Sequence, residues 1–132
     1  MGMYTEVYFR AELKAETPPE VIALLAAWVG GYADLLPLPE HEFFKCGRWA
    51  SLPVGGSAYF PTGGSPTFSR SEYGGYWTLI FRSSLKNYDD EAAKFFDWIA
   101  PYLMASEGEF LGYTLYEEAE TPTLVFQRKA TQ

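Results

Sequence analysis

The chain has 132 residues, of which 48% are hydrophobic and 18% aromatic, so disorder is excluded and one domain spanning residues 1–132 is expected. Seventeen acidic residues against ten basic ones give a net charge of −7, which disfavours binding to nucleic-acid phosphates. The single cysteine excludes an intramolecular disulfide. No signal peptide is expected, because no basic-then-apolar segment opens the sequence, and no apolar run is long enough to span a membrane. The sequence therefore predicts a cytoplasmic protein with no nucleic-acid or membrane partner.

The first predicted elements are a strand and a helix. Residues 4–13 alternate between two faces, which is the period of a half-buried strand. Thr17 is followed by two prolines and Glu20, an order that predicts a helix beginning with a capping box whose N-cap is Thr17. Gly30 and Gly31 are expected to end this helix.

The middle of the chain has a less regular pattern. Residues 32–45 are expected to form an ordered loop, because four hydrophobic side chains there favour burial: Leu35, Leu36, Phe43 and Phe44. Glycine pairs separate the short strands expected after this loop. These strands are predicted near Arg48–Leu52, Ser57–Phe60 and Thr67–Arg70.

The second half repeats the opening pattern. FRSSLK at residues 81–86 matches FRAELK at residues 9–14 in four letters, at an offset of 72 residues. Residues 76–85 predict a strand, and Asp89 is expected to be the N-cap of a second helix that Pro101 ends or kinks. Two further strands are predicted at residues 109–117 and 123–128, joined by an acidic turn.

These elements predict an α+β fold. We expect a duplicated strand–helix–strand–strand unit, with halves at about residues 1–72 and 73–132, that forms a mostly antiparallel sheet with two helices on one face. The alternative is that two buried strands share Phe and Leu through common patterning alone.

Two resemblances bear on this prediction. The phrases LKNYDDEAAKFFDWIAPYL and GEFLGYTLYEEAETPTL resemble a family of bacterial and phage proteins with no assigned function, which implies one compact unit and no particular chemistry. The doubled element order also resembles GyrI-like effector-binding domains, which bind small, often cationic or aromatic compounds in a cleft between two halves. That second resemblance is one of topology only, so no residues are carried over from it.

The sequence has no recognisable catalytic or cofactor motif. His41 and Cys46 could form a nucleophilic pair only if the fold brought them together, and an exposed loop histidine with a buried structural cysteine is the favoured interpretation. The run Asp89–Glu91 fits a helix start better than a metal site. No cofactor, metal or catalytic residue is therefore predicted.

Two other groups of residues have simpler explanations. Turns and a helix end explain the four Gly-Gly pairs better than phosphate binding, because none continues into a phosphate-loop motif. Glu117, Glu118 and Glu120 fit a solvated turn better than a pair of catalytic carboxylates.

The face of the sheet away from the helices is the candidate site. Strand alternation predicts that it carries aromatic and charged side chains, including the two repeated arginines. The predicted site residues are Tyr4, Glu6, Tyr8, Arg10, Tyr76, Ile80 and Arg82, with Thr78 and Ser84 beside them and Phe110 or Tyr116 added by the last hairpin.

Three interpretations of this face stay open. It could pack against a second copy as a homodimer interface, it could be solvated, or it could hold a small hydrophobic or aromatic ligand with Glu6, Arg10 or Arg82 as the charged anchor. We expect a non-enzymatic binding or interaction module that associates with itself. A small-molecule binding domain with an aromatic cleft is the second hypothesis, and an enzyme is the third.

Overall fold

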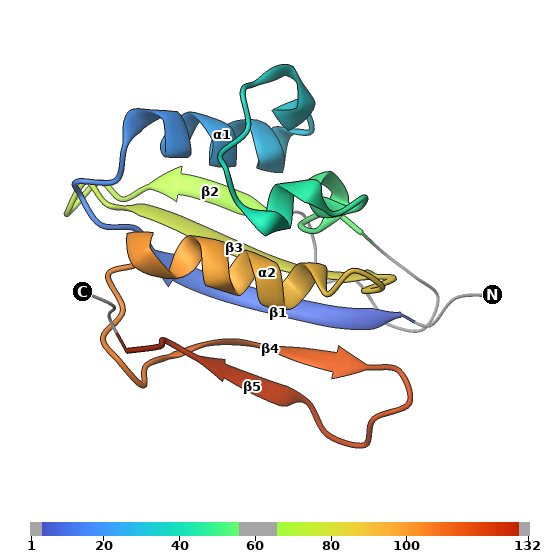
Figure 1. The fold of residues 1–132 in the computed structure, drawn as a ribbon. Coiled ribbons are helices and arrows are strands. Elements are labelled where there is room, and N and C mark those ends of the chain that lie inside the picture. Colours follow the sequence, from blue (N-terminus) through green and yellow to red (C-terminus); the bar gives the residue numbers. More distant parts are fainter. Residues whose placement is uncertain (1–3, 56–65, 130–132) are drawn as a thin grey trace.

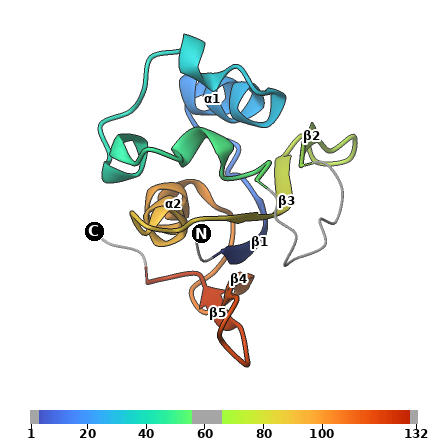
Figure 2. The ribbon, with the colours of Figure 1, turned by 90° about the vertical axis from the view of Figure 1, so that its right-hand side faces the viewer.

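The computed structural model describes residues 4–55 and 66–129. Five strands form one antiparallel sheet in the order β2-β3-β1-β4-β5, and both α-helices lie on the same face of it, as Figures 1 and 2 show. The elements are β1 (Thr5–Glu12), α1 (Pro19–Gly30), β2 (Thr67–Arg70), β3 (Trp77–Leu85), α2 (Glu91–Ile99), β4 (Phe110–Tyr116) and β5 (Thr123–Phe126). The predicted α+β fold is thus confirmed.

The two halves are interleaved in the sheet. β1 and β3 form the central pair, in which Phe9 lies opposite Phe81, so these two residues of the 72-residue repeat are also direct cross-strand partners. β2 pairs with β3, and β4 pairs with β1, so each half supplies a strand to the other half. The order β1-α1-β2-β3-α2-β4 is that of the split β-α-β arrangement of ferredoxin-like domains, and β5 adds an edge strand.

The halves differ in their last strands. The second half has the predicted order β3-α2-β4-β5, whereas the described part of the first half has β1-α1-β2. The predicted strand at Ser57–Phe60 lies outside the described residues. Internal duplication therefore stays a prediction.

The strand predicted at Arg48–Leu52 is wrong, because Trp49–Ser51 is a short 3₁₀ helix. The indole nitrogen of Trp28 donates a hydrogen bond to the Trp49 carbonyl at 2.8 Å, and the Trp49 ring packs edge-on against Phe44 at 5.2 Å. These contacts with α1 and the aromatic core fix the local conformation, which the local sequence does not indicate.

Both predicted helix starts are wrong in detail. The Thr17 hydroxyl donates a hydrogen bond to the Lys14 carbonyl at 2.7 Å, so it closes a turn instead of capping α1, whose N-cap is Pro18. The N-cap of α2 is Asp90 and not the predicted Asp89. Asp90 adopts a left-handed conformation with φ of 59°, and its side chain makes no capping hydrogen bond. The Asn87 side chain accepts from the Ala92 amide instead.

The helix ends follow the predictions. Gly31 has a φ of 87° and its amide donates to the Ala27 carbonyl, so the glycine pair ends α1 with a left-handed cap. α2 ends at Ile99, and Pro101 lies in the 3₁₀ turn Ala100–Tyr102 that follows. Neither helix has the length and apolar character needed to cross a membrane, among the residues described.

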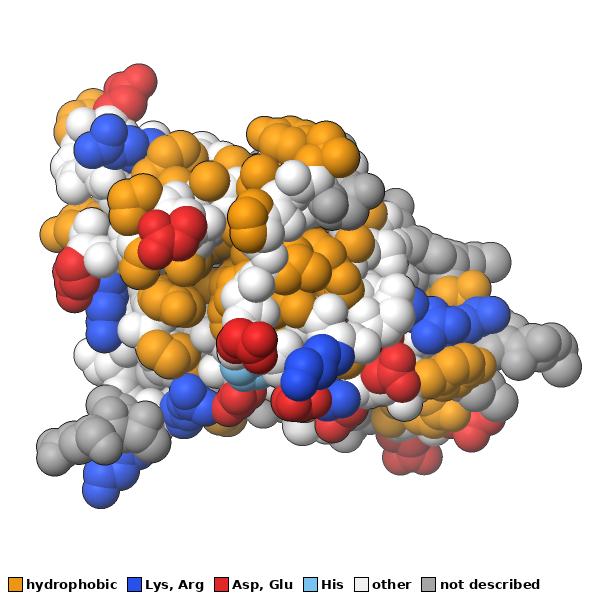
Figure 3. All heavy atoms as spheres, turned by 45° about the horizontal axis from the view of Figure 1, so that its top comes forward, with side chains coloured by type: hydrophobic (Ala, Val, Ile, Leu, Met, Phe, Trp, Pro, Cys, Tyr) orange, Lys and Arg blue, Asp and Glu red, His pale blue; other side chains and the backbone are white. Residues whose placement is uncertain are grey.

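The connection after α1 packs beside both helices as an outer layer. Phe43 and Phe44 are buried as predicted, but Leu35 is 78% exposed, so its predicted burial is wrong. Leu38 is also exposed. Figure 3 shows hydrophobic side chains gathered on this side of the molecule, with charged side chains mainly toward its edges.

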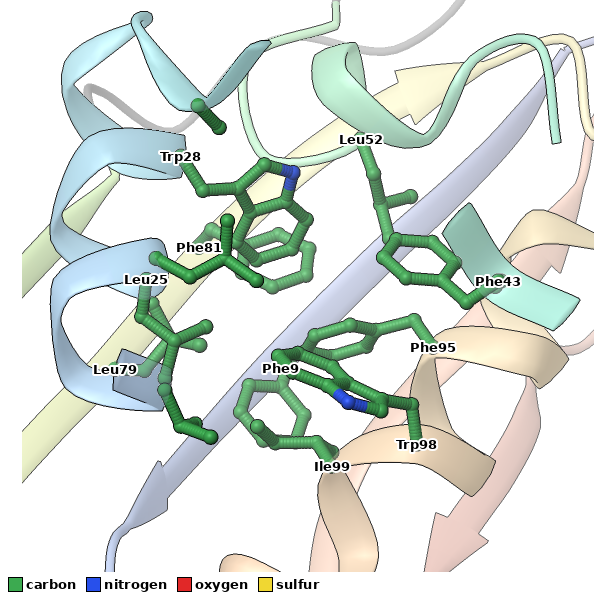
Figure 4. Close-up of a cluster of buried hydrophobic side chains, with 14 of the residues drawn as sticks. Phe9, Leu25, Trp28, Phe43, Leu52, Leu79, Phe81, Phe95, Trp98 and Ile99 are labelled. Carbon is green, nitrogen blue, oxygen red and sulfur yellow. The ribbon is translucent and has the colours of Figure 1, made fainter. Parts of the chain in front are cut away.

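The core between the sheet and the helices is largely aromatic. Phe95 of α2 is fully buried, and its ring packs against Phe9 and Trp28 at 5.1 Å and against Phe81 at 5.6 Å (Figure 4). Phe43 joins this cluster from the connection at 5.6 Å from Phe95. One core therefore joins β1, β3, both helices and the connection.

Candidate functional site

The sheet face opposite the helices is the candidate site, and it is called the open face below. Val7 and Phe9 of β1 are fully buried against the helices, so the alternate residues Glu6, Tyr8 and Arg10 lie on the open face. β3 follows the same alternation and places four predicted or neighbouring residues on the open face. Leu79 and Phe81 belong to the core, while Thr78, Ile80, Arg82 and Ser84 lie on the open face.

Cross-strand pairing arranges the open face in rows. One row runs Arg82, Tyr8, Tyr113 and Leu124 across β3, β1, β4 and β5. The neighbouring row includes Ile80 and Arg10, which are partners, and the pair Phe110 and Phe126. The part of the open face over β4 and β5 is therefore mostly apolar.

An ion pair lies at the centre of the open face. The Arg82 Nε and Glu6 Oε2 atoms are 3.2 Å apart, and the Glu6 side chain is only 10% exposed. The pKa of the neighbouring Tyr113 hydroxyl is raised, mainly by burial. The negative charge of Glu6 and a hydrogen bond to Glu6 raise that pKa further. Glu6 and Arg82 thus bind each other on the open face, and their role as anchors for a ligand stays a prediction.

Aromatic packing orders the neighbouring side chains. The Tyr8 and Tyr113 rings stack at 5.5 Å with an interplanar angle of 27°. Tyr4 directly precedes β1, and the centroid of its ring lies 5.8 Å from the Lys86 ammonium nitrogen. The Tyr4 amide donates to a carboxylate oxygen of Glu117. This end of the open face is consequently filled by the protein's own contacts.

A shallow hollow lies at the other end of the open face. Its volume is about 480 Å³, and Arg10 and Ile80 of the predicted site line it. Glu12, Thr78, Glu109 and Phe110 also contribute to its walls. The hollow combines an apolar floor with one cationic and two anionic side chains.

Two predicted members of the open face lie elsewhere. Tyr76 precedes β3 and lines a hollow beside Ile22 and Ala23 of α1, so the strand alternation does not extend to it. Tyr116 lies opposite Thr5, which places it on the helix-facing side, whereas Phe110 does join the open face. Tyr113, Leu115, Leu124 and Phe126 were missed.

Tyr113 and Leu115 were missed because of an irregularity in β4, whereas no face was predicted for β5, which carries Leu124 and Phe126. The pairing of β4 with β5 shifts between Phe110 and Gly112, which changes the alternation within the strand. A Cβ atom on Gly112 would lie 1.9 Å from the Tyr8 carbonyl oxygen, so only glycine fits there. A glycine inside a predicted strand was the available signal.

The structure separates the two residues that could have formed a nucleophilic pair. His41 is half-buried, so its predicted exposure is wrong: Nδ1 accepts from the Phe43 amide at 3.0 Å, and Nε2 bonds to Asp97 at 2.8 Å. Cys46 is buried as predicted, and burial raises the pKa of its thiol. Its sulfur contacts the Glu42 and Asp89 carbonyls, not the imidazole.

The acidic clusters have structural roles. Glu91 is fully buried, and its carboxylate accepts a hydrogen bond from the Asp89 amide at 3.1 Å. Glu118 and Glu120 are exposed in the turn between β4 and β5, whereas Glu117 bonds to Tyr4. Among residues 4–55 and 66–129, no group of three or more His, Cys, Asp and Glu side chains could hold a metal ion.

The glycine pairs that can be placed lie at turns. Gly30 and Gly31 end α1, and Gly74 and Gly75 lie in the turn between β2 and β3. The other two pairs fall wholly or partly outside the described residues.

Comparison with known proteins found no matching family model, no similar curated protein and no similar solved structure. The two resemblances drawn from the sequence therefore stay predictions. Function has to be argued from the surface itself.

Proposed function

We propose that this protein is a non-enzymatic binding module that forms a homodimer through the open face. The observation that supports this proposal is a strip of apolar side chains on the sheet: Leu124 and Phe126 are 52% and 51% exposed, and Ile80 is 40% exposed. An apolar strip of this kind on a sheet is typical of a surface that a partner covers.

The charges on the open face favour a second copy as the partner. Two molecules of net charge −7 repel each other unless the surfaces that meet are close to neutral. The β1 and β3 residues of the open face include two acids and two bases, namely Glu6, Glu12, Arg10 and Arg82. Like-charged copies can therefore approach through this face, and a twofold axis would let Arg10 of one copy face Glu12 of the other.

Sedimentation velocity of matched variants tests this proposal. The native chain is expected to sediment as a dimer, and Tyr8→Glu and Phe126→Glu are expected to sediment as folded monomers, because each places an additional negative charge on the open face. Leu35→Glu is the matched control, because Leu35 is more exposed but lies on the helix side of the molecule. A native monomer, or a dimer lost only in Leu35→Glu, would overturn the open face as the interface.

A small-molecule binding domain is the second candidate, and the hollow at Arg10, Ile80 and Phe110 is the observation that favours it. Native mass spectrometry of the purified protein separates the candidates. A dimer mass without an adduct supports the interface. A reproducible excess mass on each chain that disappears in Ile80→Glu supports a ligand in the hollow.

A further inference from the structure

A second hollow lies on the helix side of the sheet, away from the open face. Its volume is about 500 Å³, and it lies where the connection between β1 and α1 meets the turn between β2 and β3. These two segments, blue and yellow-green, come together at the left of Figure 1. We call it the cationic hollow, and its lining residues are Lys14, Ala15, Thr17, Pro19, Ile22, Ala23, Arg70, Gly74, Gly75, Tyr76 and Trp77.

The charge of this hollow is opposite to that of the whole protein. Lys14 and Arg70 line it, and no acidic residue does, although Glu16 and Glu72 each follow one of these cations by two residues. Within the described residues, neither Lys14 nor Arg70 forms a salt bridge. Two unpaired cations, 56 residues apart in a chain of net charge −7, thus converge on one hollow.

The first turn of α1 adds to this field. Pro19, the first residue of the 12-residue helix, lines the hollow, so the positive end of the helix dipole lies beside the two cations. An anion in the hollow would meet all three positive features at once.

The rest of the hollow is apolar and aromatic. Ile22 and Ala23 come from α1, Trp77 is the first residue of β3, and Tyr76 precedes it. The Trp77 ring stacks on the Phe68 ring at 4.6 Å with an interplanar angle of 18°, and this contact holds the Trp77 ring in position. These walls suit the hydrocarbon or aromatic body of a ligand.

The backbone around the hollow is held by hydrogen bonds. Arg70 Nε donates to the Gly75 carbonyl at 3.0 Å, which orients its guanidinium while leaving its terminal nitrogens for other partners. On the opposite wall, the hydroxyl and amide of Thr17 both donate to the Lys14 carbonyl. The Leu13 amide donates to the Trp77 carbonyl at 2.8 Å and ties the two walls together. The hollow is therefore formed before any ligand arrives.

From these observations we infer that the cationic hollow binds a small organic carboxylate with an aromatic or branched aliphatic body. The carboxylate bonds to Arg70 and lies near Lys14, while its body packs on Trp77 and Ile22. This inference is independent of the homodimer proposal, because the cationic hollow and the open face lie on different sides of the sheet.

Titration followed by ¹H–¹⁵N correlation spectra tests the inference with four probes. Benzoate carries both charge and an aromatic body, benzamide has the body without the charge, and acetate and inorganic phosphate have charge without the body. Benzoate is expected to shift the Gly74 and Gly75 amides and the Trp77 indole signal in a saturable way, with the other three probes at least about tenfold weaker.

Variants then assign the site. The double variant Lys14→Gln and Arg70→Gln is expected to bind benzoate about tenfold more weakly, while Arg10→Gln, which removes an exposed cation from the open face, leaves binding unchanged. All three positions are exposed, so the variants are expected to fold. Absence of saturation with benzoate, equal binding of benzamide, tighter binding of phosphate, or an equal loss in Arg10→Gln would each overturn the inference.

Discussion

The two faces of the sheet differ although they are made by alternate residues of the same strands. On the helix side, the rings of Phe9 and Phe81 stack at 5.8 Å, and the Phe95 ring packs edge-on against both of them. One residue along each strand, Tyr8 and Arg82 lie opposite each other on the open face.

The difference shows that aromatic content alone does not define a core. On the helix side, the large rings pack against one another, and the indole nitrogen of Trp28 has a backbone partner in the Trp49 carbonyl. On the open face, the stacked rings of Tyr8 and Tyr113 carry hydroxyls and lie beside the Glu6–Arg82 ion pair. The first face forms the hydrophobic core, and the second is the face for which we propose a partner.

Among the variants that compare the two faces, truncation of Phe9 on the helix side is expected to have the largest effect on the free energy of unfolding. Phe9→Ala removes a fully buried ring and should lower the free energy of unfolding by about 3–5 kcal/mol. Arg10→Ala, the next residue on the open face, should change it by less than about 0.5 kcal/mol. Urea unfolding at one protein concentration measures both. Equal losses would mean that the two faces do not differ in stability.

Substitution of Gly112 should have the next largest effect. A Cβ atom there would meet the Tyr8 carbonyl at 1.9 Å, so Gly112→Ala must push β4 away from β1 and should cost about 2–3 kcal/mol. Gly47→Ala is the matched control, because nothing lies within 4 Å of its Cβ position. Urea unfolding measures the cost, and loss of the amide signals of β1 and β4 locates it. A neutral Gly112→Ala would contradict the close β1–β4 contact.

Removal of the Glu6 charge sharpens the comparison on the open face. Glu6→Gln leaves Arg82 without its anion and should cost about 1 kcal/mol, because Arg82 is 37% exposed and part of its charge is solvated. Glu42→Gln breaks the pair with Lys45, in which both side chains are more than half exposed, and should cost about 0–0.5 kcal/mol. If both substitutions had the same cost, the Glu6–Arg82 pair would be an ordinary surface pair.

The smallest expected effect is on the titration of Tyr113. Burial and the Glu6 carboxylate hold its pKa above the ordinary value of 10.0, so Glu6→Gln should bring that pKa down. Because the folded pKa is raised, the associated stability is complete below pH 10.0 and is lost as pH rises through the folded pKa. Ultraviolet titration, with the Tyr113→Phe spectrum subtracted to remove the other tyrosines, measures the pKa. An unchanged pKa in Glu6→Gln would contradict the contact.

The central strands could be predicted because their alternation is unbroken. Every second residue of β1 from Val7 is apolar and meets the helices, and β3 repeats this phase, so Glu6, Tyr8, Arg10, Ile80 and Arg82 were placed correctly. A regular strand carries its own register information in the sequence.

The other parts depend on tertiary contacts. The irregularity at Gly112 changes the phase within β4, so Tyr113 was not assigned to the open face, and no face was predicted for Leu124 and Phe126 of β5. The start of α2 depends on a left-handed residue at Asp90, which is uncommon for a residue other than glycine. The cationic hollow joins Lys14 and Arg70 from segments that only the folded sheet brings together.

The central position of β1 also has a consequence for protein synthesis. β1 leaves the ribosome before the other strands, yet one of its neighbours, β4, is made only after β2, β3 and α2, and the bond between Tyr4 and Glu117 joins residues 113 positions apart. A nascent chain that stops before β4 has a central strand with an unpaired edge, which is a site for pairing with other chains. The pairing of β1 with β4 therefore becomes complete only after Tyr116 has been synthesised. Contacts between residues so far apart in the sequence favour slow folding.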